Sequence, residues 1–360
     1  MKPNNYIVRF DRNLLRFFRG ALRRSRSDAA TTRFLLSICV NQQRAVWRRA
    51  SWQRKGVQVP PLMIMSITDR CNLNCAGCYA RTIHPEPETE ITDARLFELG
   101  DEAEELGISI ILVAGGEPLL RPVFFELAEC HPRILFLVFT NGLLINDETL
   151  AKFESTRNLI PMLSLEGQQM ETDLRRGNGI YRMVEQKMDL LRQRGLFFGT
   201  SLTLTRSNYD LITTIGFQQN LNSLGSRVSI FVDYVPVKPD TEDLLLTSEQ
   251  KHSEPFWMRG LKDSLPGLFL SLPGDEEQYG GCLAGGRGFI HVNPHGRLEA
   301  CPFAPYSDTD LSRMSLKEAL GSELMRVIRE NANKLSESRG GCALWENRDW
   351  VLSQIGELKD

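Results

Sequence analysis

The sequence lacks any apolar run long enough to cross a bilayer. Such a span needs about 20 residues, whereas candidates such as FLLSICV are short and flanked by charge. It also lacks a recognisable cleavable signal peptide. Its eight cysteines are therefore expected in a reducing compartment, where thiols bind metal more readily than they form disulfides. We expect a cytoplasmic protein and leave peripheral attachment to the inner face of the membrane open.

Charge is unevenly distributed along the chain. The 360 residues carry a net charge of -2 and 42% hydrophobic residues, enough for one large core and a smaller domain. Residues 1–59 contain twelve Arg and two Lys against Asp11 and Asp28, which makes this segment +12 and the remainder -14.

The basic segment has the pattern of amphipathic helices. Apolar residues fall at helical spacing between arginines, and a second apolar stretch follows at 34–40. The first group contains Leu14, Leu15, Phe18 and Leu22 with Arg12, Arg16, Arg19, Arg23 and Arg24. Two interpretations stay open: a helical pair on an anionic membrane surface or acidic partner, or a helical cap whose apolar face docks on the catalytic domain. No nucleic-acid module accompanies the charge, so no nucleic-acid partner is expected.

After Pro60 and Pro61, short β-rich runs alternate with polar helical stretches. This alternation predicts βα units around a parallel sheet, whose active site would lie at the carboxyl ends of the strands. The predicted strands are 62–68, 108–114, 134–140, 159–165, 197–204 and 227–235. The expected divisions are a basic helical extension (1–59), a barrel (60–240), a linker with a helix (241–280), a small domain (281–348) and a tail (349–360).

Three cysteines follow the first predicted strand in the run TDRCNLNCAGCYA. Cys71, Cys75 and Cys78 have a spacing suited to three thiolates on three irons of one [4Fe-4S] cluster, which leaves the fourth iron open for a chelating ligand. A zinc site or a dinuclear cluster is the alternative. Zinc sites usually add a second Cys or His pair, and none lies nearby.

Polar motifs end the later strands. AGGEP follows the second strand, where Gly115 and Gly116 would let the backbone approach a ligand and Glu117 could accept hydrogen bonds from an ammonium group. TNG (140–142) ends the third strand and SLEG (164–167) ends the fourth.

The cysteine triad, with GGEP one strand later, resembles the radical SAM (S-adenosylmethionine) superfamily across residues 62–348. The resemblance implies an α/β fold with a partial (β/α)6 TIM-like barrel. It also implies SAM chelated to the open iron and cleaved reductively to a 5'-deoxyadenosyl radical, which removes hydrogen from an unactivated C–H bond. One departure is Gly77, where the family usually has an aromatic residue, so adenine packing is expected from Tyr79.

The resemblance also implies roles for individual residues. Glu117 would hold the methionine ammonium, and Glu166 would meet the ribose hydroxyls. Ser164 would lie near the methionine carboxylate, which Arg176, in TDLRRGNG, would neutralise with its bidentate fork.

The C-terminal cysteines resemble the opening of SPASM and twitch domains. Cys282 and Cys301 flank a predicted hairpin, and the later cysteine group of those domains is reduced to Cys342. This implies one auxiliary [4Fe-4S] cluster with three cysteine ligands, its fourth position open or filled by His291, His295, a carboxylate or substrate. The alternative is three buried thiols without metal.

These expectations define a radical SAM enzyme served by an external one-electron reductant. By analogy, a peptide or protein side chain is the expected substrate. A lipid or isoprenoid-like substrate at the membrane surface is one alternative. A non-enzymatic iron–sulfur electron-transfer or assembly protein is another.

Overall fold

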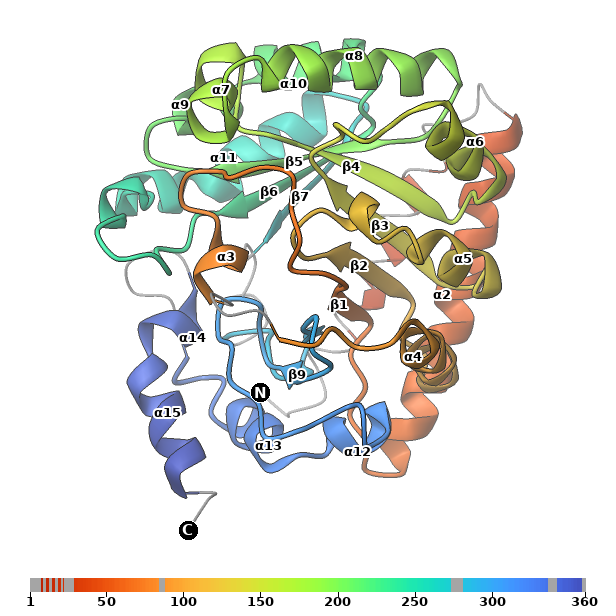
Figure 1. The fold of residues 1–360 in the computed structure, drawn as a ribbon, viewed down its shortest axis with the longest axis vertical. Coiled ribbons are helices and arrows are strands. Elements are labelled where there is room, and N and C mark those ends of the chain that lie inside the picture. Colours follow the sequence, from red (N-terminus) through yellow and green to blue (C-terminus); the bar gives the residue numbers. More distant parts are fainter. Residues whose placement is uncertain are drawn as a thin grey trace.

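A computed structural model describes residues 8, 11, 12, 15, 16, 19, 20 and 22, then 29–83, 88–272, 281–335 and 342–357. One curled sheet runs through the molecule with helices around it (Figure 1). Its strand order is β7-β6-β5-β4-β3-β2-β1-β8-β9, with all neighbours parallel except β8 and β9. The strands are β1 (Leu62–Ser66), β2 (Ile110–Ala114), β3 (Leu135–Thr140), β4 (Leu159–Leu165), β5 (Gly199–Leu204), β6 (Val228–Asp233), β7 (Leu268–Leu272), β8 (Phe289–Val292) and β9 (Leu298–Glu299).

Helices connect the parallel strands and cover the outside of the sheet. They are α2 (Ala29–Arg54), α3 (Tyr79–Ile83), α4 (Asp93–Leu106), α5 (Phe124–Cys130), α6 (Asp147–Ser155), α7 (Gln169–Arg176), α8 (Ile180–Gln193), α9 (Tyr209–Ile212), α10 (Ile215–Ser223) and α11 (Ser248–Ser264), with 3-10 turns η1 (Pro118–Leu120) and η2 (Glu242–Leu244). The C-terminal segment adds α12 (Leu316–Leu320), α13 (Glu323–Glu330), α14 (Ala343–Glu346) and α15 (Arg348–Glu357).

The strands form because their alternate residues enter two apolar clusters. Met63 and Met65 of β1 are fully buried in one cluster, together with Leu96 of α4. Ile110 of β2 belongs to the other cluster, together with Leu35 of α2. Burial on both faces is typical of parallel strands covered by helices. The expected α/β partial barrel is confirmed.

The sheet is larger than the six predicted strands. β7 lies within residues 241–280, the expected linker, and pairs parallel with β6. β8 pairs parallel with β1, so the C-terminal hairpin continues the barrel sheet. The short run LFLSL gave too little periodicity to be recognised as a strand. The division of the chain into domains stays a prediction.

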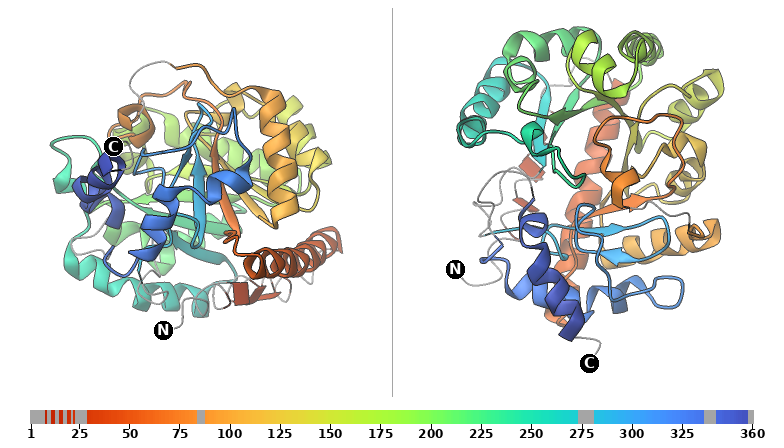
Figure 2. Two further views of the ribbon diagram at one scale, coloured as in Figure 1. Left: turned by 90° about the horizontal axis from the view of Figure 1, so that it is seen from below. Right: turned by 60° about the vertical axis from the view of Figure 1, so that its left-hand side comes forward.

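At the amino-terminal side, α2 is one uninterrupted helix along the sheet (Figure 2). Arg49 is buried and its Nη2 lies 2.6 Å from Asp11 Oδ1, while Gln42 Nε2 donates to Ser109 O. These contacts support a cap docked on the barrel. Leu14, Phe18, Arg23 and Arg24 of the predicted first helix lie outside the described residues. Among the residues that the structure describes, no helix is both long and apolar enough to span a bilayer.

Candidate active site

The cysteine triad lies in the loop between β1 and α3, at the carboxyl ends of the strands. Cys71, Cys75 and Cys78 are partly buried. Burial raises the pKa of Cys71, and the neighbouring thiols Cys75 and Cys78 add to this effect. Burial also raises the pKa of Cys75, although the positive charges of Arg176 and, to a smaller extent, Arg175 lower it. The loop therefore brings three thiols together beside two cationic side chains.

The two glycines of GGEP are required because the backbone at the end of β2 passes very close to the start of the cysteine loop. A Cβ on Gly115 would lie 2.3 Å from Thr68 O, and one on Gly116 would lie 2.2 Å from Arg70 O. The Gly116 amide donates to Thr68 O at 2.7 Å, and that of Glu117 to Arg70 O at 2.8 Å. The glycines thus join the end of β2 to the chain just ahead of Cys71, a reason that the sequence did not reveal.

Glu117 is almost completely buried at the centre of this arrangement. Its Oε1 accepts from Thr140 Oγ1 (2.7 Å) and the Leu119 amide (3.0 Å), and its Oε2 accepts from the Asn141 amide (2.8 Å). Burial raises the pKa of Glu117, and these donors act in the opposite direction. Asn141 Nδ2 also donates to Asn72 Oδ1 at 2.7 Å. The TNG motif therefore positions both the carboxylate and the cysteine loop.

A second buried carboxylate, Glu166, directly follows β4 and pairs with two arginines. Its Oε1 accepts from Arg175 Nη1 at 2.5 Å and from Arg176 Nη2 at 2.6 Å and Nε at 2.9 Å. Its Oε2 is buried and has no hydrogen-bond partner within the described part of the chain. Two guanidinium nitrogens of Arg176 thus donate to Glu166, whereas the resemblance implies that they bind the methionine carboxylate of SAM. Ser164 lies half-buried on β4, whereas the hydrogen bonds of the Arg176 side chain within the described ranges go to Glu166.

Arg175 is a site residue that the sequence analysis missed. Its Nε donates to Ala76 O at 3.1 Å, and its carbonyl accepts from the Ala76 amide at 2.8 Å. Its Nη1 also donates to Thr203 Oγ1 of β5 at 3.0 Å. Arg175 therefore ties the cysteine loop to Glu166 and β5. The Arg-Arg pair was the available signal, but sequence alone does not distinguish neighbouring arginines on a helix.

Tyr79, expected beside the adenine, contacts the C-terminal segment. Its ring lies 5.0 Å from that of Phe303, edge to face. Burial raises the pKa of Tyr79 far above its usual range. The side chain connects the start of α3 to the segment that follows Cys301.

The three C-terminal cysteines come together although sixty residues separate the first from the last. Cys282, Cys301 and Cys342 are all buried, and the sulfur atoms of Cys301 and Cys342 lie 3.9 Å apart. Burial raises the pKa of Cys301 well above its usual value, and Cys342 and Cys282 raise it further. The resemblance to SPASM and twitch domains implies that these cysteines share one site, and their role as ligands of an auxiliary cluster stays a prediction.

The two histidines considered as a fourth ligand are engaged elsewhere. His291 Nδ1 lies 2.8 Å from Glu299 Oε2, and its Nε2 lies 2.8 Å from Ser66 Oγ. His295 Nε2 lies 2.9 Å from Asp69 Oδ2. Both ring nitrogens of His291 are engaged in these hydrogen bonds, so the expectation that His291 completes a cluster is not supported. Within 29–83, 88–272, 281–335 and 342–357, no three His, Cys, Asp or Glu residues are grouped to hold a single metal ion.

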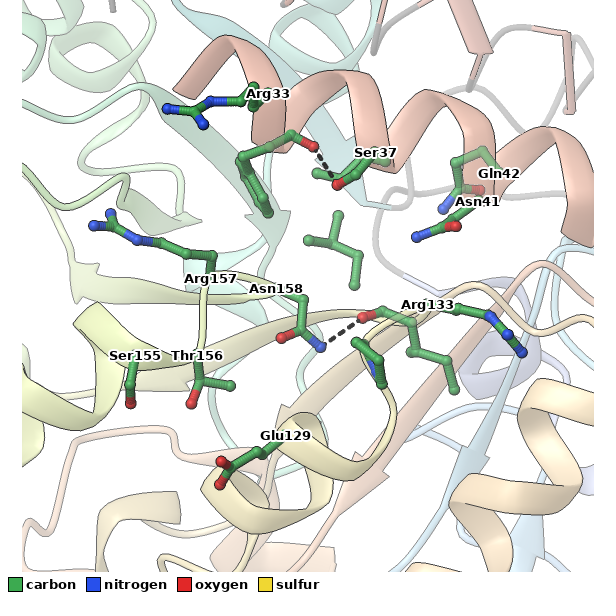
Figure 3. A pocket seen from close by; sticks show the side chains of 15 residues that line it. Arg33, Ser37, Asn41, Gln42, Glu129, Arg133, Ser155, Thr156, Arg157 and Asn158 are labelled. Atoms are coloured by element: carbon green, nitrogen blue, oxygen red, sulfur yellow. Dashed lines mark hydrogen bonds between the residues drawn. The ribbon is translucent and has the colours of Figure 1, made fainter. Parts of the chain in front are cut away.

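A cavity of about 530 Å³ lies at the opposite end of the barrel, between α2 and the segments that precede β3 and β4 (Figure 3). Asn158 Nδ2 donates to Ile134 O at 3.0 Å, and Ser37 Oγ to Phe34 O at 2.7 Å. Because these segments lead into the amino ends of their strands, the cavity is separate from the cysteine loop. It is lined by Arg33, Phe34, Ser37, Ile38, Asn41, Gln42, Glu129, Pro132, Arg133, Ile134, Leu135, Ser155, Thr156, Arg157 and Asn158.

Comparisons with known proteins agree with this geometry. The family model described as "Radical SAM superfamily" matches residues 65–214. The AdoMet-dependent heme synthase of Methanosarcina barkeri is 26% identical over 314 residues, covering 80% of this chain and 88% of that protein. Mycofactocin maturase MftC of Mycolicibacterium smegmatis is 27% identical over 315 residues, covering 80% of this chain and 76% of that protein.

A solved structure shares the fold. Streptococcus suis SuiB superimposes with a TM-score of 0.64 at 15% identity, covering 81% of this chain and 72% of that one. Residues 65–214, which the family model matches, contain the cysteine triad, GGEP and Glu166 with its two arginine partners. These features lie together at the carboxyl ends of the strands. The chain is therefore an enzyme of the radical SAM superfamily, whose chemistry uses SAM and a [4Fe-4S] cluster.

Proposed function

We propose that this enzyme oxidises or cross-links a peptide or protein side chain, using an auxiliary iron–sulfur cluster held by Cys282, Cys301 and Cys342. The observation that carries the proposal is the convergence of three buried thiols in the segment that contacts Tyr79. Buried thiols without a metal would form an ordinary apolar core, but here the segment that follows Cys301 also contacts Tyr79, the residue after the catalytic triad. A nearby acceptor would take the electron that a substrate radical releases on oxidation.

The residues of the first site fit SAM and its cluster. In this proposal Cys71, Cys75 and Cys78 bind the catalytic cluster. When bound, the cluster supplies the electron for SAM cleavage, which an external reductant must replace. The buried, unpaired Oε2 of Glu166 is an acceptor suited to a ribose hydroxyl.

The remaining contacts would orient the methionine end of SAM. Glu117 would accept from the ammonium with the acceptor capacity left by its three donors. Gly115 and Gly116 keep the end of β2 close to the cysteine loop. Arg176 would neutralise the carboxylate beside Ser164 with its Nη1, because its Nε and Nη2 donate to Glu166.

The peptide substrate is supported by the names of several relatives. MftC is called a maturase, AlbA of Bacillus subtilis a bacteriocin biosynthesis protein, and SuiB has been solved with its precursor peptide SuiA. A tetrapyrrole substrate is the second candidate, because the heme synthase relative is matched over 88% of its length.

A deuterium-transfer assay tests this choice. The reconstituted, reduced enzyme is incubated anaerobically with SAM and one of three deuterated cell fractions: peptides, tetrapyrroles or lipids. Deuterium in 5'-deoxyadenosine from the peptide fraction alone is the expected result, because the abstracted hydrogen is transferred to the 5' carbon. Label from either other fraction alone would overturn the peptide proposal. Cys301→Ala should retain SAM cleavage but form no modified product.

A peripheral membrane position is also supported by one surface. Leu36, Val40 and Trp47 of α2 are 47%, 50% and 66% exposed, and the exposed Arg44 lies among them in the helix. Apolar and basic side chains on one helix face suit an anionic membrane surface. Because α2 caps the barrel, its deletion would disturb the fold. Trp47→Ala should instead reduce sedimentation with anionic vesicles, and unchanged sedimentation would refute the attachment.

A further inference from the structure

The cysteine loop has no side chain at residue 77, and an aromatic side chain from another element occupies the adjacent space. Gly77 has φ of 65°, in the left-handed region that favours glycine. A Cβ at this position would lie 2.6 Å from Tyr234 Oη and 3.0 Å from Tyr234 Cε2. The tip of the Tyr234 ring therefore stands where a side chain of residue 77 would begin.

Tyr234 directly follows β6 and is held in place by its backbone. Its amide donates to Leu204 O at 2.9 Å, which extends the pairing of β6 with β5. The residue is only 3% exposed, and its hydroxyl has no hydrogen-bond partner within the described residues. Leaving a buried hydroxyl unpaired is energetically unfavourable, because the group loses its hydrogen bonds to water. Such a group in a native protein calls for a partner outside the chain.

The loop and the Tyr234 ring are fixed relative to each other. Arg175 binds both backbone groups of Ala76, next to Gly77, and also contacts Thr203 of β5. Thr203 pairs with Val232 of β6, two residues before Tyr234. Arg175 therefore holds the tip of the cysteine loop against the carboxyl ends of β5 and β6. The Tyr234 hydroxyl contacts this loop at Gly77, which lies between Cys75 and Cys78 in the sequence.

We propose that Tyr234 is a positioning residue for the catalytic cluster. Its ring supports the backbone of the cysteine loop at Gly77, and its hydroxyl donates a hydrogen bond to a cluster sulfur or a ligating thiolate. The inference rests on the cluster-ligand roles proposed above for Cys71, Cys75 and Cys78, and does not depend on the substrate. The aromatic side chain that the loop lacks at residue 77 is thus supplied by the residue that follows β6.

The reduction potential of the cluster tests the hydrogen bond. Hydrogen bonds to the sulfurs of a cluster tune its potential, and a donor favours the more negatively charged reduced state. In the holoenzyme, Tyr234→Phe should shift the midpoint of the SAM-responsive electron paramagnetic resonance signal to a more negative potential, with unchanged iron content. Tyr209→Phe is the matched control, because it deletes the same atom from a hydroxyl that bonds Gln250 O at 2.8 Å. It should leave the midpoint unchanged.

A double-mutant cycle tests the steric contact independently. Gly77→Ala should reduce iron retention, because its Cβ would collide with the Tyr234 hydroxyl. The added loss should be smaller in a Tyr234→Phe background, since that variant lacks the nearest atom while the backbone strain is the same in both backgrounds.

The outcomes separate the two proposals. An unchanged midpoint in Tyr234→Phe, or an equal effect of Gly77→Ala in both backgrounds, would overturn the role of Tyr234 and leave the cluster ligands unaffected. Absence of any SAM-responsive signal in the wild-type holoenzyme would instead overturn the ligand assignment on which this role rests.

Discussion

Replacing Glu166 with glutamine should destabilise the protein through the two arginines that it neutralises. The Glu166 side chain is 1% exposed, and those of Arg175 and Arg176 are 18% and 12% exposed. Removing one partner of a buried ion pair typically costs about 3–5 kcal/mol, because the other charge stays desolvated. Glutamine keeps one carbonyl oxygen as an acceptor, so we expect the lower end, about 3 kcal/mol.

Anaerobic urea unfolding followed by circular dichroism measures this loss. Glu148→Gln on α6 makes the same chemical change in an exposed pair with Lys152, at 3.2 Å and with 75% and 41% side-chain exposure. That control should lose no more than about 0.5 kcal/mol. Equal losses in the two variants would show that the stability of the buried group formed by Glu166, Arg175 and Arg176 does not depend on the charge of Glu166.

Three further predictions follow from other contacts. Gly116→Ala should abolish iron retention, because its Cβ would lie 2.2 Å from the backbone carbonyl oxygen of Arg70, just ahead of the cysteine triad. The control Gly216→Ala should retain iron, because no atom lies within 4 Å of its Cβ. Burial raises the pKa of Asp11 above the ordinary value of an aspartate, so the folded state binds more protons there than the unfolded state. As pH rises through this raised pKa, the free energy of unfolding of the wild type should therefore fall relative to that of Asp11→Asn. Urea unfolding at several pH values measures both, and the same pH dependence in the two proteins would contradict the prediction. In metal-free folded protein, iodoacetamide should label the exposed Cys130 well before the buried Cys301, as read by mass spectrometry; simultaneous labelling would contradict the burial.

Local sequence patterns were sufficient for the strands and the cysteine loop. The predicted strand at 159–165 coincides with β4, and the other five agree with the observed strands to within two residues at either end. These segments are short apolar runs bounded by polar turns, so hydrophobic pattern alone defines them. Three cysteines within eight residues also lie close together in almost any loop conformation.

Contacts between distant segments were not accessible in the same way. The sequence predicts a linker where β7 lies, because five residues give little pattern and the pairing with β6 forms only in the folded chain. The resemblance implies a role for Arg176 and none for Arg175, because the sequence does not show the orientation of α7, which decides which arginine reaches Ala76. The sequence leaves His291 open as one possible fourth ligand, because it does not show that β8 pairs with β1 and brings Ser66 to the ring of His291.

By itself, the sequence determined the chemistry: a closely spaced cysteine triad and GGEP at the ends of successive predicted strands. The tertiary structure decided what surrounds them. Only the folded chain shows that Gly115 and Gly116 contact the segment ahead of Cys71, and that the Tyr234 ring occupies the space where a side chain of residue 77 would begin. The physical reason is that thiolate spacing and strand periodicity are local properties of the chain. Steric exclusion and buried hydrogen bonding arise only when segments far apart in sequence are packed together.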